Sequence, residues 1–596
     1  MLVVVPAAQR WRLSEGGAEF ERQWLWICQD VDPDWGRRAQ AGEHIDPEAT
    51  PPVPRYFMIN DRSGYASLGM SRDARSNEAA HEDTLPSGFP RRVDVRDLSA
   101  GGPGTVRSGQ LLRCVNAGVV VHQLHFHGNH VWTVRRNGVD FPRDGLLGLV
   151  DAEGHVLLQQ WEDVVELDPR SRKETLLPLK KPPQVVEPVW AARTEDWHYP
   201  MHCHAEPSQT AAGGLYPGGM VAGWVLAGRV SPPHHTYRSQ ADFASDQPKE
   251  DDPRTEFRQR PDRSFERDVF GRRLRFPDGA EHEMWSFESE TSGRGFPAPV
   301  IRMTENELVH VRVKPSKGPH TIHLHGMEPD PRNDGVGHTS FEVSGSYTYQ
   351  FRPDAGVPGD PNEGSAGTYF YHCHVNTVLH VQMGMVGPML VDPVVHPSFP
   401  VPAGARRPFV DGPLYDIATE LMLVPYAVDP TWHHLNHAAG LSGEDVGLNR
   451  FRARHFYVLG GHLAQGQPKD RVWVPRQVRA NVSGHPTLLR VLNLNFIPTR
   501  VRFTRAGGEP VRMASLVAHD GRAYRDTVRP GSPLPEDLGN RLVTDRLAFG
   551  AAERYDMLLL PPEAGPYEIH VDWFDWVPGA AGLRLLATRT VPLTAV

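Results

Sequence analysis

Four pairs of histidines, each pair separated by a single residue, are the side chains of this sequence best suited to do chemistry. Residues i and i+2 of a β-strand point to the same face, about 7 Å apart, so each pair would present two imidazoles side by side. One such pair alone is more often a pair of surface histidines. Four pairs at repeated positions indicate metal centres, and eight converging imidazoles would hold more than one ion. The pairs are His125/His127, His202/His204, His323/His325 and His372/His374.

One of only four cysteines, Cys373, lies between two of these histidines in YHCHVNTVLHVQMGM (371–385). In a strand its side chain points away from the flanking imidazoles. On that side it can meet further donors, namely His320, His380 and Met385. Two imidazoles, a thiolate and a weak axial thioether form the ligand set of a blue-copper electron-transfer site. The alternative, a buried cysteine acting as a small hydrophobic residue, leaves these three donors unexplained.

The same alternation predicts that two metal sites are connected. The flanking histidines would bind metal on one side of the strand and the thiolate of Cys373 on the other. Electrons could then pass from the thiolate through the adjacent backbone links. A covalent path would in this way connect a mononuclear site, which takes up electrons, to a multinuclear site.

The elements that must position these groups occur twice along the chain. HQLHFHG (122–128) is followed by MHCHAEPSQTAAGGLYPGGMVAGWVL (201–226), and HTIHLHG (320–326) is followed by YHCHVNTVLHVQMGMVGPML (371–390). The order is the same in both cases, ending in a strand rich in glycine and methionine. This internal repeat predicts two copies of one β-domain.

Short alternating segments bounded by Gly, Pro, Asn or Asp predict an all-β chain of sandwiches or barrels. A charged, proline-containing stretch and a second break at 396–408 indicate boundaries. The predicted parts are a leader (1–50, interpreted as a remnant of a preceding domain), domain B (51–232), a charged linker (233–263), domain C (264–395) and domain D (400–596). Domain D lacks cysteine and the paired histidines, and its HHLNH (433–437) is interpreted as a polar loop.

Composition excludes several function classes. A net charge of −9 over 596 residues without a concentrated basic face argues against nucleic acid as a partner. No apolar run of about 18 residues predicts a membrane span, and the first residues make a poor signal peptide, so no compartment is assigned. The first residues read like the middle of a β-domain, which suggests a truncated or mis-started form of a longer protein. The cysteines are too widely spaced for a disulfide scaffold or a zinc ribbon.

The four histidine motifs resemble those of the multicopper oxidase family, which is built from cupredoxin domains. The resemblance implies tandem cupredoxin-like Greek-key domains and about four copper ions. It places type 1 copper at His320, Cys373, His380 and axial Met385. It places type 2 copper at His125 and His323, and the two type 3 coppers at His127, His202, His204, His325, His372 and His374. Domain D is similar to a copper-free cupredoxin domain of such oxidases.

Three departures from the family pattern stand out. The spacing C-x6-H between Cys373 and His380 replaces the usual C-x4-H. The type 1 ligands share a domain with HLHGMEPDPRNDG, a segment similar to the usual first-domain motif, so the domain order is permuted. Domain B keeps His122 and Cys203, but Thr210 stands where His380 would align. We interpret this as a lost type 1 site, the alternative being an unusual copper centre.

Two carboxylates are candidates for proton supply, because reducing dioxygen to water consumes protons. Asp334 matches the position of an acidic residue that the family uses in this way, and Glu206 follows His204 by two residues. The alternative for each is a solvated loop carboxylate.

The resulting hypothesis is an enzyme, a laccase-like oxidase. A small-molecule or metal-ion donor would be oxidised one electron at a time near an exposed His380, and dioxygen would be reduced to water at the trinuclear cluster. Phenols, aromatic amines, Mn(II), Fe(II) and Cu(I) are all open as donors. The alternatives are a copper nitrite reductase, a copper-storage protein and an inactive relative. The cluster could form within one chain or between subunits of an oligomer.

Overall fold

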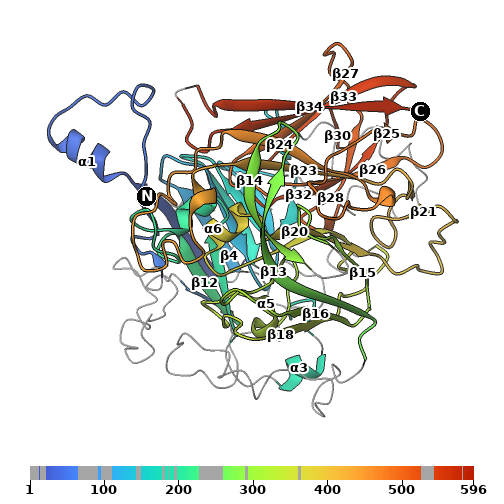
Figure 1. The fold of residues 1–596 in the computed structure, drawn as a ribbon, viewed down its shortest axis with the longest axis horizontal. Helices are drawn as coiled ribbons and strands as arrows, with labels where there is room; N and C mark the ends of the chain where they lie inside the picture. Colours follow the sequence, from blue (N-terminus) through green and yellow to red (C-terminus); the bar gives the residue numbers. More distant parts are fainter. Residues whose placement is uncertain are drawn as a thin grey trace.

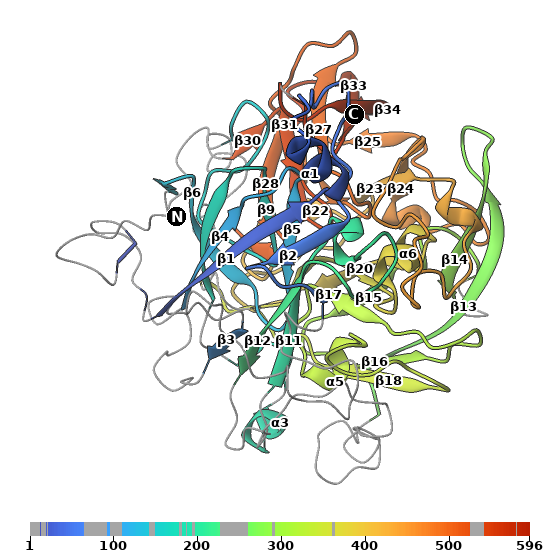
Figure 2. The ribbon, with the colours of Figure 1, turned by 90° about the vertical axis from the view of Figure 1, so that its left-hand side faces the viewer.

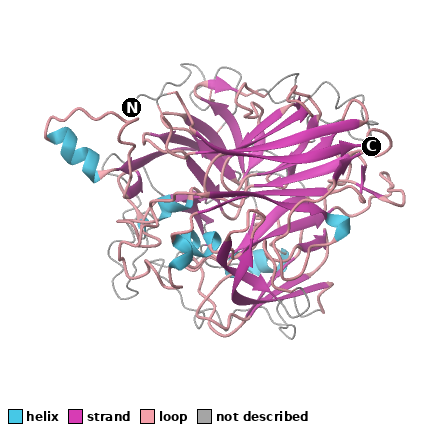
Figure 3. Cartoon of the chain, turned by 45° about the horizontal axis from the view of Figure 1, so that its top comes forward, coloured by secondary structure: helices cyan, strands magenta, loops and turns pink. Residues whose placement is uncertain are grey.

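The fold is built from three successive pairs of β-sheets, with a few short helices between strands (Figures 1 and 3). A computed structural model describes residues 12–13, 20, 22–64, 92–95, 110–141, 150–177, 181–185, 187–192, 197–226, 260–288, 293–359, 364–524, 542–579 and 581–596. Among these residues, every helix is too short or too polar to cross a bilayer. The all-β prediction is confirmed.

The first pair of sheets, here called the first sandwich, combines sheets of seven and five strands. The larger sheet has the order β2-β1-β4-β10-β6-β7, with β8 beside β6, and the smaller has the order β3-β12-β11-β5-β9. The strands are β1 (Arg22–Val31), β2 (Tyr56–Ile59), β3 (Arg92–Val95), β4 (Gln110–Asn116), β5 (His122–Phe126), β6 (Val131–Arg136), β7 (Val139–Asp140), β8 (Gln160–Glu162), β9 (Val164–Leu167), β10 (Arg172–Leu177), β11 (Trp197–Cys203) and β12 (Val221–Leu226). The helical segments are α1 (Pro33–Gln40), α3 (Glu187–Ala192) and the 3-10 helix η3 (Glu206–Gln209).

Part of the predicted leader belongs to this sandwich. Strand β1 runs parallel to β4, with Arg22 opposite Gln110 and Cys28 opposite Asn116 (Figure 2). Trp26 and Cys28, two residues apart on β1, are both fully buried in the core of the sandwich. The prediction of a separate leader is therefore wrong for residues 22–31. These residues form a strand of the larger sheet and bury apolar side chains in the core of the sandwich.

The second sandwich carries the Cys373 segment and has two four-stranded sheets. Their orders are β14-β13-β16-β18 and β15-β20-β19-β17. The elements are β13 (Arg263–Arg275), β14 (Glu281–Glu288), β15 (Ile301–Thr304), β16 (Val309–Val313), β17 (His323–His325), α5 (Pro331–Asp334), β18 (Tyr347–Phe351), β19 (Gly367–His372), α6 (Thr377–Gln382) and β20 (Val386–Asp392). Most of the predicted charged linker, up to residue 259, lies outside the described residues.

The third sandwich repeats the seven- and five-stranded arrangement of the first. Its sheets have the orders β24-β23-β26-β32-β28-β29, with β30 beside β28, and β25-β34-β33-β27-β31. The elements are β21 (Ala405–Arg406) and β22 (Tyr415–Asp416), which pair with each other, β23 (Leu421–Val428), η5 (Trp432–His434), β24 (His455–His462), η6 (Leu463–Gln465), β25 (Val478–Ala480), β26 (Thr487–Leu492), β27 (Thr499–Arg505), β28 (Ala514–His519), β29 (Arg522–Ala523), β30 (Val543–Thr544), β31 (Arg546–Phe549), β32 (Arg554–Leu559), β33 (Gly565–Phe574) and β34 (Leu585–Ala595).

The repeated histidine motifs fold in the same way in the first two sandwiches. In the first, β5 pairs antiparallel with β11 and sets His125 opposite His202. In the second, β17 pairs antiparallel with β19 and sets His323 opposite His372. Because side chains alternate along a strand, each pairing aligns the imidazoles of two strands on one face. Sheet register thus places one histidine of each motif opposite a histidine of its partner motif in both sandwiches.

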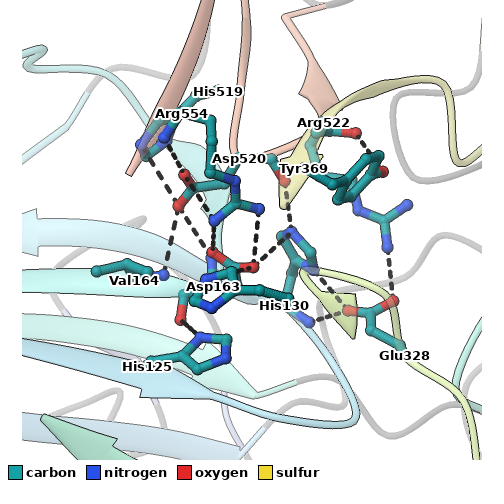
Figure 4. A network of polar contacts seen from close by, with 12 residues as sticks. His125, His130, Asp163, Val164, Glu328, Tyr369, His519, Asp520, Arg522 and Arg554 are labelled. Carbon is teal, nitrogen blue, oxygen red and sulfur yellow. Dashed lines mark hydrogen bonds and ion pairs between the residues drawn. The ribbon is translucent and has the colours of Figure 1, made fainter. Parts of the chain in front are cut away.

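A buried polar network holds the three sandwiches together (Figure 4). The guanidinium of Arg554 in β32 donates to both carboxylate oxygens of Asp163, at 2.6 and 2.9 Å. The carboxylate of Asp520 accepts from the backbone N–H groups of Asp163 and Arg554. Glu328, from the second sandwich, contacts His130 Nδ1 at 2.6 Å and accepts from Arg522 Nη2 at 2.6 Å. Each sandwich therefore supplies charges to one network.

Removing the cation from this network should weaken the whole assembly. Arg554→Ala would leave Asp163 and Asp520 buried without their partner, because the Arg554 and Asp163 side chains are at most 1% exposed. A broken buried ion pair costs about 3–5 kcal/mol. We expect the urea midpoint of the metal-free protein, followed by tryptophan fluorescence, to fall sharply.

The matched control is Arg312→Ala, because the Arg312–Glu266 pair is exposed on both sides. Loss of an exposed pair should cost less than about 1 kcal/mol. Equal midpoints for the two variants would contradict a structural role for the network.

Candidate metal centre

All eight paired histidines lie in one buried cluster between the first and second sandwiches, within a single chain. The ring nitrogens form three groups of three, and within each group they lie within 4.8 Å of one another. The groups are His125/His127/His323, His127/His202/His374 and His204/His325/His372. Each group draws on both sandwiches, so neither sandwich alone holds a complete set.

Several distances show how closely the rings approach. His202 Nε2 is 3.1 Å from Nε2 of His127 and 3.1 Å from Nε2 of His374. The Nε2 atoms of His125 and His323 are 3.4 Å apart. Nitrogens at this separation, all facing one another, are suited to share bound cations.

Backbone carbonyls fix the orientation of several rings. The Nδ1–H groups of His125, His323 and His372 donate to the carbonyl oxygens of Asp163, Asp334 and Cys373, at 3.0, 2.6 and 3.0 Å. This leaves Nε2 unprotonated and directed into the cluster, as second-shell acceptors do for metal-binding histidines.

The buried nitrogens at the centre of the cluster fit a metal. Nε2 of His204, His325 and His372 has no hydrogen-bond partner among the residues that the structure describes, although each atom is inaccessible to solvent. A buried polar atom without a partner is costly, and a coordinated cation would satisfy it. Burial, followed by the charge of neighbouring imidazoles, also lowers the pKa of His325 and His372 well below the usual value. The rings are therefore neutral, which is the form that binds metal.

The predicted proton carriers both lie against cluster histidines. Asp334 Oδ2 is 3.0 Å from His127 Nδ1, and the carboxylate is fully buried. Burial would raise its pKa, but the charge and hydrogen bonds of His127 and His323 outweigh burial and lower it. Glu206 Oε1 is 2.9 Å from His204 Nδ1, and burial raises its pKa well above the usual value. Asp334 thus orients His127, whereas Glu206 lies against His204.

Replacing Asp334 should loosen the cluster. In Asp334→Asn the acceptor for His127 Nδ1–H is weakened while the size of the side chain is kept. Loss of such a partner typically costs 10–100-fold in metal affinity. We expect copper bound by the purified apoprotein in competition with a chelator to fall by that factor.

Asp429→Asn is the control, because this buried carboxylate accepts from Thr431 and the Arg452 N–H and, within the described part of the chain, makes no hydrogen bond to a histidine. Unchanged affinity in Asp334→Asn, or an equal loss in both variants, would contradict a positioning role.

A second, separate group forms around Cys373. Its Sγ is 3.4 Å from His320 Nδ1 and 3.2 Å from His380 Nδ1. Its backbone N–H donates to the carbonyl of Met385 at 3.1 Å, and Met385 is fully buried. The structure thus brings His320, Cys373 and His380 together, with Met385 adjacent through the backbone.

The longer spacing between Cys373 and His380 is taken up by a short helix. Helix α6 begins after Asn376, which adopts the left-handed conformation (φ 47°), and the His380 N–H donates to the Asn376 carbonyl at 3.0 Å. Gly384 then turns the chain at φ +109°, where an added Cβ would lie 2.6 Å from the Trp285 carbonyl. The extra residues form a helical turn that returns His380 to the thiol.

His380 is buried, which corrects the expectation of an exposed ring. Its Nε2–H donates to the carbonyl of His437 at 3.2 Å, and the imidazole Nε2 of His437 lies 3.1 Å from Nε2 of His320. His437 is partly exposed and belongs to the third sandwich. The segment interpreted as a polar loop therefore covers the Cys373 group.

Sequence reasoning missed several residues that the structure places at these sites. They include Asp163, whose Oδ2 is 3.6 Å from His325 Nε2, His338, whose ring centre is 5.6 Å from that of His374, Tyr216, whose hydroxyl is 3.1 Å from His374 Nδ1, and His437. Of these, only Tyr216 lies within a repeated segment. In the sequence, only the residue type could have marked these positions as possible parts of a metal site.

Comparison with known proteins finds a matching family model and several relatives. Residues 274–395 match the family model described as multicopper oxidase. Copper resistance protein A of Escherichia coli is 31% identical over 317 residues, which cover 51% of this chain and 47% of that protein. L-ascorbate oxidase of Cucumis sativus is 28% identical over 182 residues, which cover 29% of this chain and 24% of that protein.

Among solved structures, the blue copper oxidase from Nitrosomonas europaea is similar over 56% of this chain and 86% of that chain, with 21% identity and a TM-score of 0.36. The chain spans about half the length of copper resistance protein A, and less of ascorbate oxidase. Residues 274–395 are thus similar to the multicopper oxidase family, whose cofactor is copper.

Proposed function

We propose that this protein is a multicopper oxidase, which couples one-electron oxidation of a donor to four-electron reduction of dioxygen to water. Its site would use His320, Cys373, His380 and Met385 for type 1 copper. It would use His125 and His323 for type 2 copper, and His127, His202, His204, His325, His372 and His374 for the type 3 pair. Bound copper would supply the electron transfer and the dioxygen chemistry.

One observation carries the proposal, which is that Cys373 links the two groups through its neighbours. The thiol contacts His320 and His380 on one side of the strand. His372 and His374 join the histidine cluster on the other side. Cys373 is joined by one peptide link to His372 and by another to His374. This covalent path is short enough to conduct electrons between the two groups.

The chain's own residues would also prepare the site for proton delivery. Asp334 holds the His127 ring, and its low pKa makes it an acceptor at neutral pH. Glu206 has a raised pKa and can hold a proton at the oxygen facing His204. We therefore propose Glu206 as proton carrier and Asp334 chiefly as the residue that positions the imidazole.

A nitrite reductase is the second candidate, because nitrite reductase of Neisseria meningitidis is 29% identical over 124 residues. Those residues cover only 20% of this chain. As a nitrite reductase pairs blue copper with one three-histidine copper, five of the eight clustered histidines would have no role. The arrangement favours the oxidase.

The first test is Cys373→Ser. Copper-loaded protein should show an intense band near ~600 nm with about four coppers per chain, and the variant should lose the band and one copper. Dioxygen consumption by Cys373→Ser with phenols, Mn(II) or Fe(II) should fall to background. Cys114→Ser, at a buried cysteine of β4, is the control and should keep both properties. A band that survives in Cys373→Ser, or nitrite turnover without dioxygen consumption, would contradict the oxidase.

The second test concerns where electrons are taken up. Both outward imidazole nitrogens of the Cys373 group meet His437, so a donor must act through or beside this residue. His437→Ala should slow reduction of the ~600 nm chromophore in anaerobic stopped flow and raise the donor KM, while the cluster reoxidises normally. His434→Ala, at an exposed histidine of the same loop, is the control. Equal rates for both variants would exclude His437 from electron uptake.

A further inference from the structure

The first sandwich contains a buried His–Cys pair with the same geometry as the pair in the second. His122 Nδ1 is 3.4 Å from Cys203 Sγ, and His320 Nδ1 is 3.4 Å from Cys373 Sγ. Both His122 and Cys203 are fully buried. Although the sequence suggested a lost site here, the two donors still face each other.

A third donor position is also kept. The N–H of Cys203 donates to the carbonyl of Met220 at 3.2 Å, as the N–H of Cys373 donates to that of Met385 at 3.1 Å. Each methionine directly precedes the strand that pairs with its cysteine strand, β12 in one case and β20 in the other. Met220 is fully buried in the same core as Cys203. By backbone position, Met220 is the counterpart of the axial Met385.

The fourth donor has no counterpart in the described segment that follows Cys203. This segment forms the 3-10 helix η3 and ends at Thr210, whose hydroxyl donates to the Pro207 carbonyl at 2.8 Å. Its oxygen is therefore engaged locally, and Thr210 offers no imidazole. The structure thus brings His122 and Cys203 together, with Met220 adjacent to Cys203 through the backbone.

The surroundings prepare His122 as a ligand. Asp30 Oδ2 lies 3.4 Å from His122 Nε2, and both side chains are fully buried. Asp30 and Cys203 lie at opposite nitrogens of the His122 ring, so the ring is oriented with Nδ1 toward Cys203 Sγ. A carboxylate beside the far nitrogen is also the second-shell arrangement of metal-binding histidines. The backbone N–H of Gln123 donates to Cys203 Sγ at 3.3 Å.

We propose that His122, Cys203 and Met220 bind a soft monovalent cation, Cu(I). Thiolate and thioether ligands select Cu(I), whereas the blue Cu(II) site needs two imidazoles and a thiolate in one plane. This site would accordingly hold copper without contributing a blue band. It is distinct from the Cys373 group and from the histidine cluster, because Cys203 points to the face of β11 opposite His202.

The test uses the Cys373→Ser protein, which removes the other thiolate site and makes the result independent of oxidase activity. Ag(I), a redox-inert mimic of Cu(I), is added to the metal-free protein, and bound silver is counted after equilibrium dialysis. X-ray absorption at the silver edge reports sulfur neighbours. We expect Cys373→Ser/Cys203→Ser to bind one silver fewer and to lose the silver–sulfur signal.

Cys373→Ser/Cys114→Ser is the control and should match the parent in both readouts. If Cys203→Ser perturbs the fold, seen by near-UV circular dichroism, Met220→Leu replaces it, because this swap conserves core volume. Met220→Leu should weaken silver binding about tenfold. Unchanged binding in Cys203→Ser and Met220→Leu, or an equal loss in Cys114→Ser, would overturn the proposal.

Discussion

The alternation of side chains where β19 ends, from His372 to the next residue Cys373, is the constraint on which the arrangement of both sites depends. His372 and Cys373 are consecutive, so the extended backbone must direct one toward the first sandwich and the other into its own sandwich. Pairing with β17 then brings His323 opposite His372. A slip of one residue in this register would exchange the faces and dismantle both groups at once.

The histidine cluster also depends on contacts that are not part of it. The two sandwiches that supply imidazoles meet over a buried network in which Arg554, from the third sandwich, holds Asp163. The Asp163 carbonyl in turn orients His125. The third sandwich can therefore support the histidine cluster without supplying any of its eight paired histidines, because a charge buried at the junction acts strongly in the low-dielectric interior.

The parts foreseen from the sequence were those encoded by short spacings. His-x-His pairs and the Cys–His–Met order could be read directly because strand periodicity is local. The burial of His380 and the position of His437 could not be predicted, because they follow from how the third sandwich packs on the second. The contact between these two residues joins positions 57 apart in the sequence. Strand β1 was missed for a similar reason, because its partner β4 is distant in the chain.

The position of Arg554 in the third sandwich has a consequence for biosynthesis. A ribosome releases the His-x-His strands of the first sandwich long before β32 has been made. Until then Asp163 lacks its counter-charge, and the junction between the first two sandwiches lacks the cation that neutralises it. The histidine cluster therefore reaches its final arrangement only after β32 has been synthesised and has packed against the first sandwich.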